Sequence, residues 1–442
     1  MNVLILSMVA QRDWIVDNMI ADAVKAKGHD AVVRKFLRDD RTAIVVEKPD
    51  VCVIPPVRCE YSRDLAVRLK QWGVKVIARR SEAGVSRKQY DKLKRTWQLD
   101  HIGRYSYKKT IDLELVWSRE FADILIDEGM VRPDQVRIIG GITLDPYFKW
   151  DLAENSAKVF TSNREEWLCK RNLDPQKRTL YFVTGFVHAV RPVYTLPEAP
   201  LGDPIHAELH QRDLRLRTMW IDAVCRFAET DRYNVILRPH HGEDHSVYDP
   251  CRRAGAYVSV EGSAGENLYF SDLLVHAGST MAIEAHLLKK PAFSLGSTAQ
   301  DDMIGDVSPY CDSIEELTVA IQQAVYGQSN AKIKTLKDLE KSFYGPIDGK
   351  AHQRCAEVIC EFGVQDNKKI PNAWPEDELR DYTSPGVVKI DMKFPLVYCQ
   401  ACKKASQNMT GQISYRCPHC SIMITKIHKP QYTIGVKQNG KG

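Results

Sequence analysis

Short apolar runs alternate along the first third of the chain with longer segments in which apolar residues recur every three to four positions. The short runs predict buried strands at residues 2–8, 30–36, 51–54, 74–78, 113–117 and 136–139. The longer segments predict helices at residues 13–27, 62–72 and 118–129. Strands separated by helices of this length are typical of right-handed βαβ units around a parallel sheet. We therefore expect a first Rossmann-like domain at about residues 1–155.

The same alternation begins again near residue 175. It predicts strands at residues 179–183, 234–238, 256–260, 273–276 and 291–295, and helices at 211–229, from about 280, and at 313–326. Residues 186–210 hold four prolines and three histidines without a period, which indicates a long loop near a site. We expect a second doubly wound domain at about residues 175–330.

Helical patterns flank this second domain. They lie at residues 156–173, 333–341 and 349–362. We expect the helices within 331–362 to cross back and pack on the first domain. Residues 363–393 are polar, contain proline and lack a clear period, so they are expected to be a linker. Residues 394–442 form a separate module.

Two doubly wound domains in tandem place a ligand site at the carboxyl ends of both sheets, in the cleft between them. Several polar or glycine-containing motifs follow predicted strands of the second domain. They contain Gly185, Arg238, His240, Glu243, Gly278, Ser279, Thr280 and Glu284. Glu82 follows a strand of the first domain and is expected at the corresponding edge.

Residues 272–290 carry the most informative of these motifs. A strand ends at His276, the chain turns at Gly278, and a helix begins near Thr280, which Ser279 or Thr280 can cap. Free amides and the positive end of a helix dipole favour an anion at such a turn. Glu284, one turn into the helix, is placed to accept hydrogen bonds from a ribose. The pattern is equally that of an ordinary βα turn.

Composition narrows the protein class. Apolar residues make up 44% and charged residues 27% of the 442 positions, as in soluble globular proteins. No apolar run reaches 18 residues, so no membrane span is expected. The apolar start has no basic region before it and is interpreted as a strand rather than a signal peptide. Eight of the twelve cysteines are scattered singly, which indicates reduced core residues and a cytoplasmic protein.

The other four cysteines form a regular pattern in the last module. Cys399 and Cys402 make one CxxC pair, and Cys417 and Cys420 make a second after 14 residues. Two such pairs at this separation are typical of one tetrahedral Zn²⁺ site. Four cysteines leave no open position for water, so the predicted zinc is structural. Because about 45 residues bury little apolar surface, the metal is expected to supply the folding free energy of a zinc ribbon.

Several enzyme signatures are missing from the sequence. No GxxxxGK[ST] and no GxGxxG after the first strand occurs, which disfavours P-loop ATPases and dehydrogenases. No Asp-x-Asp occurs, so no catalytic metal is expected. Arg238 and His240 could neutralise a leaving phosphate without a metal. They are equally compatible with a structural turn at a strand end.

Four segments carry a family resemblance when they are taken in order. They read DLELVWSREFADILIDEGM, VRIIGGITLDPY, VILRPHHGE and LLVHAGSTMAIEAHLLKKPAFSLG. This set resembles GT-B glycosyltransferases, and most closely bacterial surface-carbohydrate (capsule) biosynthesis proteins, over about residues 1–362. Capsular Kdo and glycerophosphate transferases and the non-hydrolysing UDP-GlcNAc 2-epimerases are nearby relatives. His241 and the Gly141-Ile142 pair depart from the residues usual in that family, and the zinc module is not a usual part of it.

The resemblance implies a metal-independent glycosyltransferase that uses a nucleotide-sugar donor. Gly278, Ser279 and Thr280 would then meet the phosphates and Glu284 the ribose, with Gly185 and Glu243 in the same nucleotide site. Arg238 and His240 would face the phosphate or the developing charge. Glu82, in the turn Ser81-Glu82-Ala83-Gly84, would be the general base that takes the acceptor proton. An exposed loop glutamate fits the same position.

Four functions remain open at this stage. The acceptor of a transferase could be a surface glycan, or it could be modified bases of DNA held through the zinc ribbon and the basic tail. An epimerase of the same fold would release a free sugar from a UDP-HexNAc without an acceptor. A nucleic-acid- or protein-binding scaffold would keep its function after Glu82→Gln and Glu284→Ala but lose it after Cys399→Ser.

Overall fold

The structure is a computed structural model that describes most of residues 1–375 and four short strands beyond them. The gaps up to residue 375 are at 9, 38, 59, 82–85, 89, 92–106, 151–162, 187–188, 190–203, 241–242, 261–262, 297–303, 305–306, 328–334 and 341–343. The chain divides into two compact units, Met1–Tyr382 and Thr383–Gly442. We describe each unit by itself.

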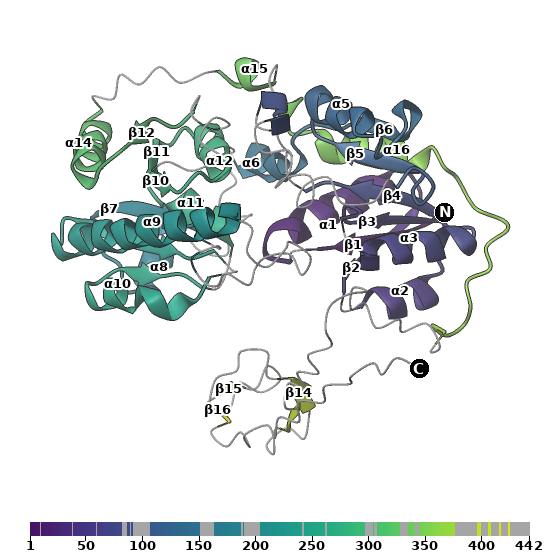
Figure 1. The fold of residues 1–442 in the computed structure, drawn as a ribbon, viewed down its shortest axis with the longest axis horizontal. Coiled ribbons are helices and arrows are strands. Elements are labelled where there is room, and N and C mark those ends of the chain that lie inside the picture. The colour runs from purple at the N-terminus through teal and green to yellow at the C-terminus, as the bar shows by residue number, and fades with distance from the viewer. Residues whose placement is uncertain are drawn as a thin grey trace, which may run out of the picture. The chain divides into compact units, whose positions relative to one another are not determined.

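Six parallel strands form the first sheet of unit 1, drawn in purple to blue in Figure 1. The strands are β1 (Asn2–Ser7), β2 (Asp30–Lys35), β3 (Val51–Ile54), β4 (Lys75–Arg79), β5 (Leu113–Val116) and β6 (Val136–Ile138). Each lies within one residue of its predicted bounds. The inner strands β1, β3, β4 and β5 are buried almost throughout, whereas the edge strands β2 and β6 are only partly buried. The order across the sheet is β2-β1-β3-β4-β5-β6, so the chain reverses its direction of winding between β1 and β3.

A second sheet of six parallel strands follows, drawn in teal and green in Figure 1. It comprises β7 (Arg178–Val183), β8 (Tyr233–Arg238), β9 (Tyr257–Val258), β10 (Leu273–His276), β11 (Ala292–Leu295) and β12 (Tyr310–Cys311). The order is β12-β11-β10-β7-β8-β9, which places the reversal between β7 and β10. The two-residue strand β12 is too short to leave a pattern in the sequence and was not predicted.

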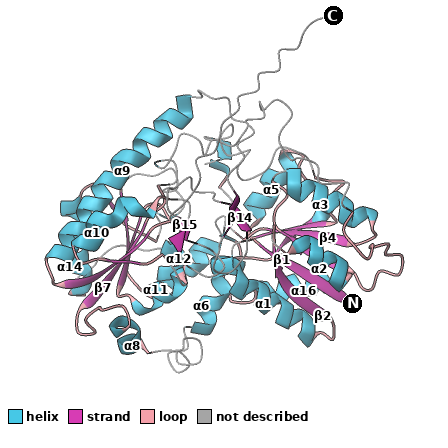
Figure 2. Cartoon of the chain, turned by 90° about the horizontal axis from the view of Figure 1, so that it is seen from below, coloured by secondary structure: helices cyan, strands magenta, loops and turns pink. Residues whose placement is uncertain are grey.

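Helices flank both sheets (Figures 1 and 2). Those of the first sheet are α1 (Ala10–Ala26), α2 (Asp40–Glu47), α3 (Glu60–Gln71), α5 (Arg119–Asp127), α6 (Asp145–Trp150) and α16 (Ala351–Cys360). The remaining helices are α8 (Arg164–Cys169), α9 (Pro204–Glu229), α10 (Asp249–Arg253), α11 (Ala264–Phe270), α12 (Met281–Leu287), α14 (Ile314–Val325) and α15 (Leu336–Leu339). Short 3₁₀ turns are η2 (Pro133–Gln135), η3 (Ile142–Leu144) and η5 (His245–Tyr248).

Two helical segments differ from the sequence-based expectation. α2 was not predicted, because only Ala43 and Ile44 of its apolar residues are buried. Its eight residues make only about two helical turns, which is too short for a clear apolar period. The loop predicted at 186–210 is wrong for its last seven residues, where α9 begins at Pro204. Proline is tolerated at the first helical position because the N–H it lacks has no partner within the helix.

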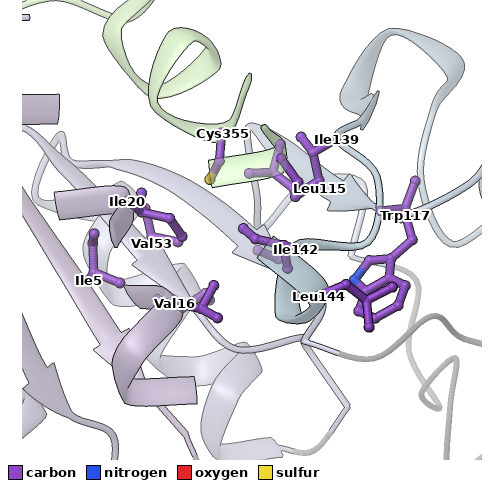
Figure 3. Close-up of a cluster of buried hydrophobic side chains, with 14 of the residues drawn as sticks. Ile5, Val16, Ile20, Val53, Leu115, Trp117, Ile139, Ile142, Leu144 and Cys355 are labelled. Carbon is purple, nitrogen blue, oxygen red and sulfur yellow. The ribbon is translucent and has the colours of Figure 1, made fainter. Parts of the chain in front are cut away.

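α16 lies along α1 and completes the core of the first sheet (Figure 2). Figure 3 shows Cys355 of α16 in the same buried cluster as Ile20 of α1, Val53 of β3 and Leu115 of β5. His352 also fastens the start of α6, because its backbone N–H and its Nδ1 both lie within 2.7 Å of Asp145 Oδ2. The chain therefore returns to the first sheet after completing the second.

Residues 363–375, which we call the strap, also pack on the first domain although their composition predicts a linker. The carboxylate of Asp50, 2% exposed, accepts hydrogen bonds from the backbone N–H groups of Asn2 at 2.6 Å and Gln365 at 3.1 Å. Lys368 Nζ forms an ion pair with the same carboxylate at 2.5 Å. One buried acid therefore ties the start of β1 to the strap.

The end of the strap lies on the outer surface of α2 and α3. The ring of Trp374 meets the ring of Trp72 edge to face at 5.2 Å between centroids. The Arg41 guanidinium lies 5.5 Å from the centroids of both Trp374 and Tyr61. Such cation–π contacts stabilise the packing in addition to the apolar area that the rings bury. The strap is therefore fixed up to Trp374.

Unit 2 contains two short antiparallel pairs among its described residues. β13 (Leu396–Tyr398) pairs with β14 (Ala405–Gln407), and β15 (Tyr415–Arg416) pairs with β16 (Met423–Ile424). Cys399 and Cys402 fall in the connection of the first pair, and Cys417 and Cys420 in that of the second. These four cysteines lie outside the described residues.

No helix among the described residues combines the length and the apolar character that are needed to cross a bilayer.

Candidate functional site

The reversal between β7 and β10 marks the place where the second sheet is expected to bind a ligand. In an open α/β sheet the loops that leave the two strands at such a point diverge and leave a crevice at their carboxyl ends. The loop after β7 begins with Thr184 and Gly185, and the loop after β10 begins with Ala277 and Gly278. Gly185 is exposed, and a Cβ added to it would lie 3.7 Å from the Ala277 carbonyl oxygen. The structure thus brings the predicted residues Gly185 and Gly278 to adjoining loops.

The turn after β10 is held by a histidine that the sequence did not single out. His276, fully buried, accepts the backbone N–H of Ser279 at Nδ1 at 3.1 Å, and its Nε2 lies 2.7 Å from Ser308 Oγ. Burial lowers the pKa of His276 to about 3, so the ring is neutral at physiological pH. A neutral ring that accepts at Nδ1 carries its proton on Nε2 and donates to Ser308.

The same turn decides which of the two predicted residues caps α12. Ser279 Oγ accepts the backbone N–H of Met281 at 3.2 Å, whereas Thr280 makes no such side-chain bond. Gly278 is buried and has a φ of +71°, a conformation that glycine adopts without strain. The N–H of Ser279 is engaged inside the protein, while Thr280 is exposed.

Glu243 joins the loops that follow β7 and β8. Its Oε1 accepts the Thr184 hydroxyl at 2.6 Å and the backbone N–H groups of Phe186 at 3.0 Å and His240 at 3.3 Å. Its Oε2 accepts the hydroxyl of Tyr248. The carboxylate is only 7% exposed. The geometry therefore gives Glu243, predicted as a nucleotide-site residue, an internal role that positions the backbone of His240.

Arg238 and Glu284 come from a strand and a helix of the second domain, and the charges of both act on one buried tyrosine. Arg238, at the end of β8, donates from Nη1 to Ser259 Oγ at 3.4 Å. Tyr181 of β7 is fully buried, which raises the pKa of its phenol; the charge of Arg238 opposes that shift and the charge of Glu284 adds to it. Tyr181, on one of the two strands that flank the β7/β10 reversal, therefore lies within electrostatic reach of one basic and one acidic side chain.

Glu284 also has a partner from the first domain. The hydroxyl of Tyr147, on α6, donates a hydrogen bond to Glu284 Oε2. Tyr147 is 6% exposed, and burial together with the carboxylate raises its pKa well above the ordinary value. Sequence reasoning missed Tyr147, although it ends one of the quoted segments, because a tyrosine in a DPY turn has no distinctive spacing.

The candidate base, Glu82, lies outside the described residues, as does His241. The neighbouring residues Arg80 and Glu114 form a fully buried pair, with 2.6 Å between Arg80 Nε and Glu114 Oε1. Arg80 Nη2 also donates to the Tyr107 hydroxyl at 2.8 Å. The buried Arg80–Glu114 ion pair thus fixes the end of β4, which precedes Glu82, within the first domain. Among the residues that the structure describes, no group of three or more His, Cys, Asp or Glu is placed to hold a metal ion.

Comparisons with known proteins reveal the fold rather than a family. No family model matches the chain, and no curated protein matches it. The S. aureus MnaA–UDP co-structure is similar, with a TM-score of 0.51 and 15% identity over 85% of this chain and 100% of that one. The UDP-GlcNAc 2-epimerase from Methanocaldococcus jannaschii has a TM-score of 0.52 and 12% identity, over 82% and 100%.

A polymerase shares the fold as well. The wall teichoic acid polymerase TagF (H548A) has a TM-score of 0.51 and 12% identity, over 81% of this chain and 88% of that one. Each of these likenesses spans both six-stranded sheets, and each falls at an identity where only architecture is comparable. The chain has the two-domain α/β fold of the GT-B type that these structures share.

Proposed function

We propose that this protein is a metal-independent glycosyltransferase that moves a sugar from a nucleotide-sugar donor to an acceptor. The observation that supports it most is that Arg238, at the end of β8, and Glu284, on α12, both act electrostatically on Tyr181 of β7, at the β7/β10 reversal. The Arg238 guanidinium can bind a diphosphate, and the Glu284 carboxylate, one turn into α12, can accept ribose hydroxyls. Solved structures of the same fold include one complex with UDP and one with UDP-GlcNAc and UDP.

Each predicted residue has a role in this proposal. Gly185, Gly278 and Thr280 flank the diphosphate, where both Gly185 and Thr280 are exposed. Ser279 holds the start of α12 through its hydroxyl. Arg238 and His240 neutralise the charge that develops on the leaving nucleotide. Glu82 remains the proposed base for the acceptor hydroxyl.

Donor binding tests the proposal directly. UDP-, GDP- and CMP-sugars would be titrated while unfolding of the full chain is followed, since a ligand at a hundredfold excess over its Kd stabilises by ~2.7 kcal/mol. Arg238→Ala should then lower kcat/KM by about 100-fold or more. Arg226→Ala is the matched control, because Arg226 is exposed on α9 and pairs with Asp222 and Glu315. Absence of stabilisation by every nucleotide and nucleotide sugar would overturn the proposal.

An epimerase with the same fold is the enzymatic alternative. The likeness to 2-epimerases leaves it open, because at these identities the comparisons reach the architecture alone. Incubation with UDP-GlcNAc alone separates the two functions. Inversion at C2 of the sugar without an acceptor, whether the sugar stays on UDP or is released, supports the epimerase, whereas strict dependence on an added acceptor supports the transferase.

A glycan is our first proposal for the acceptor, and one observation favours DNA as a second candidate. Residues 383–442 contain one acidic residue, Asp391, and nine basic residues. The basic residues are Lys389, Lys393, Lys403, Lys404, Arg416, Lys426, Lys429, Lys437 and Lys441. Unit 2 thus carries a formal charge of +8, and since the whole chain carries +5, unit 1 carries −3.

The positive charge of unit 2 favours its binding to a polyanion such as DNA. Retardation of duplex DNA by the full chain, with an affinity that falls steeply as salt rises, supports the DNA acceptor. Lys403→Glu combined with Lys404→Glu should weaken the retardation and flatten its salt dependence. Retardation that is equal for wild type and variant contradicts the DNA acceptor and leaves the glycan.

We also propose that unit 2 holds one structural Zn²⁺. The support is the position of the two CxxC pairs, each of which falls in the connection of an antiparallel strand pair. This is the arrangement in which two pairs of thiolates can close one tetrahedral site. Cys399, Cys402, Cys417 and Cys420 would be the four ligands.

A further inference from the structure

Glu284 is expected to bind the ribose, yet the structure gives its carboxylate a partner from the first domain. Tyr147 lies on α6, whereas Glu284 lies on α12, which follows strand β10 of the second sheet. The two helices contact each other, and the Tyr147 hydroxyl donates to Glu284 Oε2. A residue far away in the sequence therefore adjoins the proposed ribose position.

The first domain holds Tyr147 firmly in place. α6 begins at Asp145, whose buried carboxylate accepts the backbone N–H of His352 at 2.7 Å and lies 2.6 Å from its Nδ1. The turn before α6 is closed by the backbone N–H of Gly141, which donates to the Pro346 carbonyl oxygen at 3.0 Å. The Tyr147 hydroxyl is thus presented by a helix that α16 and the preceding turn fix at its start.

The chemistry of the pair suits orientation rather than acid–base work. Burial and the Glu284 charge keep the Tyr147 pKa far above physiological pH, so the phenol remains a donor. A carboxylate has about four acceptor positions, of which one phenol uses one. Fixing Oε2 therefore fixes the direction in which the same carboxylate receives other donors. A ribose that offers vicinal hydroxyls benefits from an acceptor whose rotamer is already selected.

We propose that Tyr147 is a positioning residue of the nucleotide site, which orients Glu284 for the ribose hydroxyls and thereby sets selectivity for ribo- over deoxyribonucleotides. This inference rests on the proposed function. It adds a first-domain residue to a site otherwise built from the second sheet. It also implies that nucleotide binding and the contact between α6 and α12 favour each other.

Calorimetric titration of the full chain with UDP and 2′-deoxy-UDP tests the inference, with GDP and CDP pairs if UDP does not bind. Wild type should prefer the ribonucleotide. Tyr147→Phe keeps the ring and should weaken ribonucleotide binding about tenfold. It should leave the affinity for the deoxynucleotide nearly unchanged, so that the preference collapses. Glu284→Gln should lose the same preference, and the double variant should lose no more than either single one.

Tyr61→Phe is the matched control. Tyr61 also donates to a carboxylate, Asp40 Oδ2 at 2.5 Å, but on α3 and α2 of the first domain. Its nucleotide affinities should equal those of wild type. A full ribonucleotide preference in Tyr147→Phe overturns the inference while the proposed function stands. Failure of wild type to bind any nucleotide overturns the proposed function itself. If Tyr147→Phe is unfolded by thermal melting, Glu284→Gln decides, since a retained preference there also overturns the inference.

Discussion

The Thr184 hydroxyl donates to Glu243 Oε1 at 2.6 Å and so joins the loop after β7 to the loop after β8. Three further donors share this buried carboxylate. The pair thus controls where the backbone of His240 lies, although neither residue needs to touch a substrate.

Thr184→Val should reveal that role, because valine keeps the shape but removes the donor. We expect the free energy of unfolding to fall by about 1–3 kcal/mol, since a buried charged acceptor loses a partner. Urea denaturation measures it. Thr218→Val is the control, since its exposed hydroxyl donates only to the Leu214 carbonyl within α9 and should change stability little. Equal midpoints for both variants would contradict the role of the Thr184–Glu243 bond.

The neutral ring of His276 predicts a specific pH dependence of stability. Its folded pKa is about 3, against about 6.5 in an unfolded chain. Above pH 6.5 neither state is charged. As the pH falls from about 6.5 toward 3, the unfolded chain takes up a proton that the folded ring refuses, and stability drops by about 1.4 kcal/mol per pH unit.

His276→Asn should remove this slope while its amide oxygen can still accept the Ser279 N–H. Urea unfolding at pH 7 and pH 4.5 would give the difference between the two proteins. Carboxylates whose pKa values are lowered in the fold, such as Asp50 and Asp348, titrate in both proteins and cancel. Parallel pH curves for wild type and variant would refute the neutral buried ring.

The Arg80–Glu114 pair predicts a marked asymmetry between single and double substitutions. Both side chains are fully buried. Arg80→Met alone should cost about 3–5 kcal/mol, because it leaves a buried carboxylate without its cation. Arg80→Met with Glu114→Leu should recover much of that loss. A double variant at least as unstable as the single one, by chemical denaturation, would show that the pair stabilises the fold in itself.

Protease sensitivity can test the strap. Asp50→Asn weakens the ion pair to Lys368 and the bonds that hold the segment. Trypsin should then cut after Lys368 or Lys369 several-fold faster than in wild type, with the first domain still folded. Asp366→Asn, an exposed change inside the strap, is the control. Cutting at the wild-type rate in Asp50→Asn would mean that Asp50 does not secure the segment.

Metal removal gives the prediction for unit 2. Wild type should release one zinc per chain to a strong chelator under denaturing conditions. The Cys399→Ser variant should release less than one zinc per chain. Nucleotide binding by unit 1 should survive the loss, because the two units are separately compact. A metal content near zero in protein purified under reducing conditions would rule out the structural zinc.

The sequence predicted those parts of the fold that depend on local patterns. Apart from β12, the strands of both sheets contain short apolar runs, such as VLIL in β1, and their positions were found within a few residues. The expected sites at Arg238, His240 and Gly278 do follow strands, because parallel sheets present such residues at one edge. The contacts that depend on a single distant partner could not be predicted from the sequence.

Two residues and one segment illustrate that limit. The functional appearance of Glu243 came from its motif, whereas its four hydrogen bonds come from loops that only the fold assembles. Tyr147 acquires meaning only beside Glu284, 137 positions later. The polar strap looked like a linker because its contacts use Asp50 and backbone groups, which leave no hydrophobic period.

The strap has a further consequence, for the volume that unit 2 can explore. Twenty residues separate Pro375 from Leu396, which limits their separation to about 70 Å even for a fully extended chain. One module confined to a sphere of that radius has an effective concentration on the order of 1 mM. A polymer that unit 2 binds only weakly would therefore be presented to unit 1 repeatedly before it escapes. Fixing the chain at Trp374, rather than at the end of α16, makes that sphere smaller.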